Sequence, residues 1–228
     1  MHYLFVITLI LLVVFGPHWW AQYTFRRYSK PMPHIPGTGG ELARHLLDRF
    51  DMQDVKVEIA GREGDHYDPM DRVVRLSNAN HNDNSLTAVA VAAHEVGHAI
   101  QHHRGEALLK WRSRLAVLAM VVEKIGAAAL LAMPFMTLLS RAPSLGIAMV
   151  AIGLGSMLVA TLVHLVTLPV ELDASFGKAL PVLTEGNYIQ PDDEAAVRTI
   201  LRAAALTYLA ASLASLLNLW RWIRVLRP

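Results

Sequence analysis

Residues 86–103 read LTAVAVAAHEVGHAIQHH, an apolar run that ends in a cluster of histidines. The run predicts a buried helix, and the first two histidines of the cluster, His94 and His98, lie four residues apart. In a helix this spacing places them on one face, about 6 Å apart along the axis. Two imidazoles so arranged can bind one Zn²⁺, and Glu95 lies beside the first of them, where it can take a proton from metal-activated water. The H-E-x-x-H pattern therefore predicts a zinc-dependent hydrolase site, against the alternative of surface histidines on an amphipathic helix.

A catalytic zinc usually has three protein ligands and one water. His102 continues the four-residue spacing, but it would lie about 12 Å from His94 along the helix axis, too far to share one metal ion. The pattern with a further histidine six residues after His98 is also absent, because that position is Arg104. The third ligand is therefore expected to be a carboxylate from elsewhere in the chain.

Glu171 is the candidate, in the stretch Pro169-Val170-Glu171-Leu172-Asp173-Ala174-Ser175 at the end of an apolar run. Two antiparallel apolar helices between His98 and Glu171 would return the chain to the level of the zinc helix. Pro169 is compatible with a helix break or the first turn of a new helix. The alternative is a glutamate that only begins a helix. Asp173 is either a residue that orients a ligand histidine or a solvated turn residue.

The composition limits the classes of protein. The 228 residues are 54% apolar and 18% charged, with a net charge of +2 and no cysteine. High apolar content excludes disorder, and the absence of cysteine excludes disulfides, thiolate metal sites and cysteine nucleophiles. With no basic run, nucleic acid is not an expected partner.

Apolar runs predict about four membrane helices, since roughly 20 apolar residues cross a bilayer core of about 30 Å. The runs are residues 2–24, 115–139, 145–168 and 203–220. A cleaved signal peptide is the alternative for the first run, and a buried hairpin of a soluble protein is the alternative for the middle pair. The fold class expected is mainly α, with multi-pass membrane helices and a zincin-like cytoplasmic α+β catalytic region that carries the H-E-x-x-H helix.

The predicted membrane spans divide the chain into five segments. They are a transmembrane helix at 1–28, the catalytic region at 29–114, a transmembrane hairpin at 115–168, a segment with the third ligand and a connecting helix at 169–200, and a last transmembrane helix at 201–228. Within the catalytic region, Thr38 and Glu41 form a capping-box pattern for a helix through Phe50. Alternation predicts strands at 55–59 and 72–76, joined by a turn-rich connection.

The connection between these strands contains His66 and Tyr67, followed by Asp68-Pro69. The two side chains are candidate donors to the oxyanion of a tetrahedral intermediate. An ordinary turn is the equally weighted alternative, because Asp-Pro is common turn chemistry. The 72–76 strand is expected to offer an edge to which an extended substrate adds through main-chain hydrogen bonds.

Several motifs, in one order along nearly the whole chain, resemble the bacterial membrane zinc metallopeptidases of the YugP type. They are Asp65-His66-Tyr67-Asp68-Pro69, Val74-Arg75-Leu76-Ser77, the run from Val91 to His102, Thr167-Leu168-Pro169-Val170-Glu171 and Ala203-Ala204-Ala205-Leu206-Thr207-Tyr208. The layout is also similar to that of the HtpX and CAAX-prenyl peptidases, in which an E-x-x-A-D run supplies the third ligand. Glu171 and Ala174 match that run, whereas Ser175 stands in place of its aspartate.

The sequence therefore predicts a membrane-integral zinc endopeptidase of the gluzincin type, with Zn²⁺ as cofactor. Its metal ligands are His94, His98 and Glu171, its general base is Glu95, and His66 and Tyr67 are further catalytic candidates. Its partners are a protein or peptide substrate and the lipid bilayer, with a membrane-protein partner or an oligomer left open. Positive charges beside the first two spans place residues 30–114 in the cytoplasm and the chain in the cell (inner) membrane. The alternative is a non-catalytic membrane scaffold with a retained zinc site.

Overall fold

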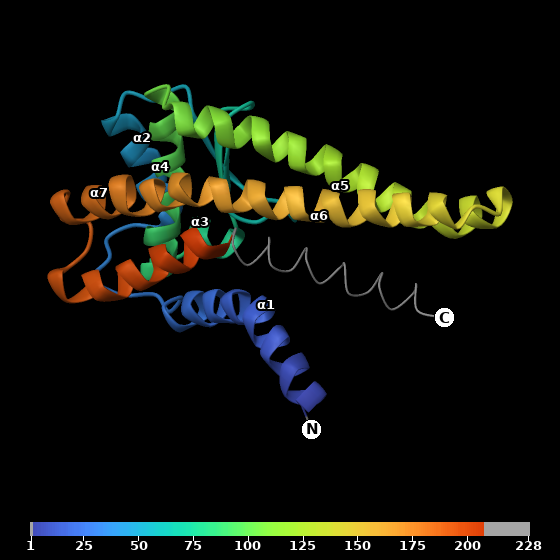
Figure 1. Ribbon diagram of the computed structural model, residues 1–228. Coiled ribbons are helices and arrows are strands. Elements are labelled where there is room, and N and C mark those ends of the chain that lie inside the picture. The colour runs from blue at the N-terminus through green and yellow to red at the C-terminus, as the bar shows by residue number, and fades with distance from the viewer. Residues whose placement is uncertain (1, 208–228) are drawn as a thin grey trace. The chain divides into compact units, whose positions relative to one another are not determined.

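The computed structural model describes residues 2–207, which divide into two compact units (Figure 1). In this part of the chain, one unit contains residues 2–16 and 111–167, and the other contains residues 17–110 and 168–207. The helix predicted to bind zinc, residues 86–103 (the zinc helix below), and the segment with Glu171 belong to the second unit, although a long helical hairpin separates them in the sequence.

Two helices of the second unit begin where the sequence predicts. In α2 (Gly39–Arg49) the backbone N–H of Thr38 donates to the Glu41 carboxylate at 2.8 Å, and the N–H of Glu41 donates to the Thr38 hydroxyl at 3.2 Å. This confirms the capping box. In α4 (Leu86–His103) the Ser85 side chain caps the first turn, and the helix is buried from Leu86 through Gln101. The predicted buried helix at residues 86–103 is confirmed as a central helix of this unit.

A three-stranded sheet lies against α4. Its strands are β1 (Lys56–Ile59), β2 (His66–Asp68) and β3 (Val73–Leu76), in the order β1-β3-β2, with β1 parallel and β2 antiparallel to β3. The two predicted strands are confirmed, but His66 and Tyr67 lie in a third strand where a turn-rich connection was expected. The expectation that the 72–76 strand offers a free edge is wrong. Because β3 pairs with a strand on each side, its main-chain groups are used within the sheet.

Glu171 is reached along a continuous helical path. α6 (Pro143–Leu172) passes directly into a π-helix, η1 (Asp173–Ala179), and then into α7 (Leu180–Glu185). Both alternatives for Pro169, a helix break and the first turn of a new helix, are wrong, since this residue lies inside α6. A proline in a helix interior removes one hydrogen bond and can bend the helix without ending it. A short α3 (Asn78–Asn82) precedes α4, and a 3₁₀ turn, η2 (Pro191–Asp193), precedes a helix at residues 194–207.

The core of the second unit is built from α2, α4, the sheet, the π-helix with α7, and the last described helix. The last helix contributes Val197, Ile200 and Leu201 to this core, and Ala203, Ala204 and Ala205 are also buried. The apolar run predicted as a fourth membrane span therefore begins inside the compact unit. Residues 208–220 of that run lie outside the described part of the chain.

The other unit contains most of the hairpin of α5 (Ala107–Ser140) and α6, namely residues 111–167 (Figure 1). The two helices approach closely at Gly126, where an added Cβ would overlap the Ser156 side chain. Small residues at helix contacts are typical of helix pairs in lipid. Among the described residues, one helix, α5, is long and apolar enough to cross a membrane, with a mean hydropathy of 2.1 over an 18-residue stretch. The runs at 2–24 and 145–168 lie in the helices α1 (His2–Arg27) and α6, and four membrane spans stay a prediction.

Gly97, inside the H-E-x-x-H motif, sets the distance between α4 and the π-helix. A Cβ at this position would lie 2.7 Å from the carbonyl oxygen of Ala174, a backbone atom that cannot rotate away. Ala174 lies between the candidate ligand Glu171 and Ser175 in the sequence. Close backbone approach at Gly97 therefore brings the third-ligand segment against the zinc helix.

Gly97→Ala is expected to weaken zinc binding although the residue is not a ligand. The added methyl group must push η1 away from α4, and overpacking of this kind costs about 1–3 kcal/mol. Isothermal titration with zinc and thermal unfolding would measure the two effects. Gly61→Ala is the matched control, since a Cβ at Gly61 meets no atom within 4 Å. Zinc binding by Gly97→Ala equal to that of the control would contradict this explanation.

Candidate metal centre

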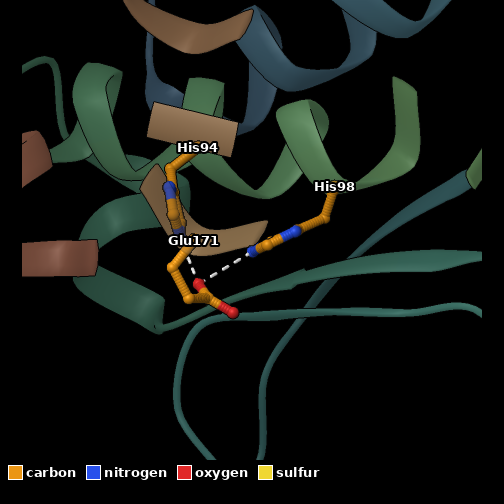
Figure 2. A group of neighbouring side chains, drawn as sticks. All are labelled: His94, His98 and Glu171. Carbon is orange, nitrogen blue, oxygen red and sulfur yellow. Dashed lines mark hydrogen bonds and ion pairs between the residues drawn. The ribbon is translucent and has the colours of Figure 1, made fainter. Parts of the chain in front are cut away.

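His94, His98 and Glu171 converge in the interior of the second unit, as Figure 2 shows. Oε2 of Glu171 lies 3.1 Å from Nε2 of His98 and 3.5 Å from Nε2 of His94. One potential ligand atom from each residue lies within 4.8 Å of the others. The two imidazole rings are 4.8 Å apart and nearly perpendicular, at 76°. This arrangement presents two nitrogens and one oxygen to a common point.

All three side chains are buried. Glu171 is 0% exposed, and His94 and His98 are 3% and 2% exposed. An ionised carboxylate removed from water is costly unless a cation or hydrogen bonds compensate for its charge. The buried Glu171 carboxylate beside two imidazole nitrogens is therefore the arrangement that a positive ion would stabilise.

The residues present fit zinc. Two imidazole nitrogens and one carboxylate oxygen are a donor set found in catalytic zinc sites, which use three protein ligands. Here the two nitrogens come from one face of α4, and the oxygen comes from the last turn of α6. His94, His98 and Glu171, the ligands predicted from the sequence, would hold the ion.

Each histidine also has a hydrogen-bond partner at its other nitrogen. Nδ1 of His98 lies 2.9 Å from Oε1 of Gln101, and Nδ1 of His94 lies 3.0 Å from Oγ of Ser175. Such partners orient metal-binding imidazoles. Sequence reasoning did not assign a role to Gln101 or to Ser175. The spacing could have identified both residues as neighbours of the ligands on one helix face, because Gln101 follows His98 by three residues and Ser175 follows Glu171 by four.

Asp173 is linked to the site through Gln101, the partner of His98. Its carboxylate accepts a hydrogen bond from Nε2 of Gln101 at 2.7 Å and an ion pair from Lys178 at 2.9 Å. Lys178 also pairs with Glu106 at 3.2 Å. Burial raises the pKa of Asp173, but the hydrogen bonds from Gln101 and Lys178 outweigh burial and lower the pKa. Asp173 thus touches the glutamine behind His98, and it is Ser175 that contacts His94.

Glu95 lies beside the ligands on α4. It is 7% exposed, more than any of the three candidate ligands. Within residues 2–207, its carboxylate has no hydrogen-bond or ion-pair partner. Glu95 is thus buried, and a carboxylate that no protein group holds can accept a proton from a nearby water or substrate.

In the described part of the chain, no hydrogen bond or ion pair joins His66 or Tyr67 to the three-residue cluster. The Tyr67 hydroxyl is hydrogen-bonded to Nδ1 of His102 at 2.8 Å, and Nδ1 of His66 lies 2.9 Å from the carbonyl of Gly64. Burial raises the pKa of Tyr67 to about 12 and lowers the pKa of His102. The Tyr67 hydroxyl therefore keeps its proton at neutral pH, and the catalytic role of both residues stays a prediction.

Comparison with known proteins agrees with this geometry. Residues 3–227 match the model of a family described as "Putative neutral zinc metallopeptidase". The chain belongs to this family. It is 39% identical over 223 residues to the "Putative membrane protease YugP" of Bacillus subtilis (strain 168), an alignment that covers 95% of this chain and 94% of the relative. The resemblance read from the motifs is thereby confirmed. No solved structure gives a significant match.

Glu171→Ala is expected to lower zinc affinity by more than about 100-fold, the upper end of what loss of a residue that orients a ligand costs. Asp173→Ala should retain zinc with a smaller loss, because Asp173 contacts Gln101 and no ligand directly. Competition with a zinc chelator would measure both affinities on the full-length protein. Wild-type affinity in Glu171→Ala would show that this residue is not the third ligand.

Proposed function

We propose that this protein is a membrane-integral zinc endopeptidase that hydrolyses peptide bonds with Glu95 as general base. The observation that carries the proposal is the buried cluster of His94, His98 and Glu171 with Glu95 beside it on the same helix. The family match and the name of the relative support the same reaction class. The arrangement proposed is zincin-like, with the glutamate ligand of a gluzincin.

When bound, zinc would supply Lewis-acid chemistry, polarising the scissile carbonyl and making water more acidic. Glu95 would take the proton of the attacking water on a carboxylate oxygen and transfer it to the nitrogen of the leaving amine. This role suits its position, since Glu95 follows the candidate ligand His94 on α4 and its side chain has no partner among the described residues.

Tyr67 and His66 are proposed donors to the oxyanion of the tetrahedral intermediate. The Tyr67 hydroxyl carries its proton at neutral pH, because burial raises its pKa to about 12. To act on a substrate it would have to leave His102, its partner at 2.8 Å. An electrostatic donor of this kind commonly contributes about 2.7–4 kcal/mol to transition-state stability.

An extended peptide is the proposed substrate, bound through its main chain. β3 is enclosed between two strands, so pairing would have to occur at an edge of the sheet. β2 is the edge strand whose Tyr67 contacts His102 on the zinc helix. Main-chain pairing at an edge provides affinity with little sequence preference.

Membrane integration is proposed from the surface of the helical hairpin. Large apolar side chains are exposed along α5 and α6, including Val117, Val121, Ile125, Leu131, Phe135, Leu138, Ile147, Ile152, Leu158 and Leu162. Soluble proteins rarely expose so extensive an apolar surface, whereas lipid would cover it favourably. The positive charges near the start of α5 support the proposal that the metal centre faces the cytoplasmic side of the cell membrane.

Glu95→Gln tests the mechanism. The substitution removes the proton acceptor but leaves His94, His98 and Glu171, so zinc content should stay near one ion per chain. Peptidase activity should fall at least about 100-fold, the usual lower scale of general acid–base catalysis. Hydrolysis of a fluorescently labelled unfolded protein by purified protein in detergent would measure the rate.

Glu185→Gln is a suitable control, because Glu185 is an exposed glutamate at the end of α7. It should cleave the substrate at the wild-type rate. Full activity of Glu95→Gln would refute the assigned base. A wild-type protein that binds zinc but cleaves no peptide would favour the scaffold alternative.

Single cysteines test the membrane orientation, since the chain has none of its own. Glu63 and Gln190 are exposed positions in the second unit, far apart in sequence. Both Glu63→Cys and Gln190→Cys should resist an impermeant maleimide added to intact cells and react after the membrane is opened. Reaction of both from outside would reverse the orientation, and reaction of only one would contradict the placement of this unit on one side.

A further inference from the structure

The hydrogen-bond partners behind the two histidines determine which nitrogen of each ring carries a proton. Nε2 of Gln101 donates to the carbonyl of Val170 at 3.0 Å and to the carboxylate of Asp173 at 2.7 Å. Both partners can only accept, so the amide nitrogen must face them. The amide oxygen then faces Nδ1 of His98, and since this oxygen is an acceptor, Nδ1 of His98 must carry the proton.

The same reasoning applies to His94. The Ser175 hydroxyl has one proton, and it donates that proton to the carbonyl of Leu201 at 3.1 Å. Its oxygen, 3.0 Å from Nδ1 of His94, is then left to accept. Nδ1 of His94 must therefore carry a proton, as in His98.

In each neutral ring, Nε2 then carries a lone pair. Both Nε2 atoms face the same oxygen of Glu171, at 3.5 Å and 3.1 Å, in a buried setting. Electron-rich atoms that face one another without water repel, unless a cation lies between them. The network behind the rings thus selects the form of each histidine that can bind a metal ion.

We propose that Gln101 and Ser175 are positioning residues that hold His98 and His94 as Nδ1–H tautomers and so preset both Nε2 atoms as metal ligands. The inference rests on the proposed metal site and adds to it the residues that prepare it. The two residues come from different elements, Gln101 from the zinc helix and Ser175 from the π-helix. Each is 1% exposed or less, which protects its hydrogen bonds from competition with water.

Asp173 acts through Gln101. Its carboxylate holds the amide nitrogen, and Lys178, which also pairs with Glu106, holds the carboxylate in turn. This chain of contacts prevents the amide from rotating by half a turn, which would present N–H groups to Nδ1 of His98. The Asp173 carboxylate contacts the amide nitrogen of Gln101, and it is the amide oxygen of Gln101 that faces Nδ1 of His98.

Zinc affinity of full-length variants tests the proposal. Gln101→Met and Ser175→Ala remove the acceptors with little change of shape, and each should weaken zinc binding by about 10–100-fold. Thr87→Val is the matched control. The Thr87 hydroxyl is also buried on α4 and donates to a backbone carbonyl, that of Phe25 at 2.9 Å, but it contacts no candidate ligand. The control should lose a similar hydrogen bond and keep wild-type zinc affinity.

A spectroscopic measurement on the wild-type protein does not depend on how the variants fold. With zinc bound and histidines labelled with ¹⁵N, the two rings that respond to zinc should each show a proton on Nδ1 and coordination through Nε2. Coordination through Nδ1 in either ring would overturn the proposal, whatever the variants do.

The outcomes separate this inference from the proposed function. If the wild-type protein binds no zinc, the proposed function fails and the inference fails with it. If the wild-type protein and both variants bind zinc with affinities within threefold of each other, the metal site stands and the positioning role is refuted. Weaker binding in Gln101→Met and Ser175→Ala, unchanged binding in Thr87→Val and Nδ1–H in both rings would support it.

Discussion

The second unit is organised around one constraint, which is that a carboxylate is fully buried. Glu171 is 0% exposed, and its oxygen lies against two imidazole nitrogens. The effective penalty for burying an unpaired charge is several kcal/mol, so the surrounding structure must hold compensating groups in place. The close backbone contact at Gly97 and the hydrogen bonds behind both histidines serve this one requirement.

Main-chain groups, and not only the three candidate ligands, determine the geometry of this site. Ser175 is fixed by a main-chain carbonyl, Gln101 is fixed by another, and Gly97 permits two main chains to approach. The segment that carries Ser175 is a π-helix, a rare conformation that is frequent at functional sites. Main-chain groups do not change with most substitutions, so the orientation of the imidazoles depends on few side chains.

Much of this arrangement could be read from the sequence, for reasons that differ between its parts. The spacing of His94 and His98 follows from helical periodicity, and the apolar run before them predicts burial. Glu171 could be chosen because two helices of similar length return the chain to its starting level. β2 was missed because three residues are too few for alternation to be recognised. Gln101 and Ser175 were missed because their role depends on carbonyls of Val170 and Leu201 that only the folded chain brings near.

The order of the ligands along the chain has a consequence for how the protein is made. Glu171 follows His98 by 73 residues, and the whole helical hairpin lies between them. At about 5–20 residues per second, a ribosome would need roughly 4–15 seconds to pass from one to the other. During this interval the nascent chain has two histidines but no third ligand. The proposed metal site could therefore not be completed, and the proposed hydrolysis could not begin, before the hairpin has been synthesised.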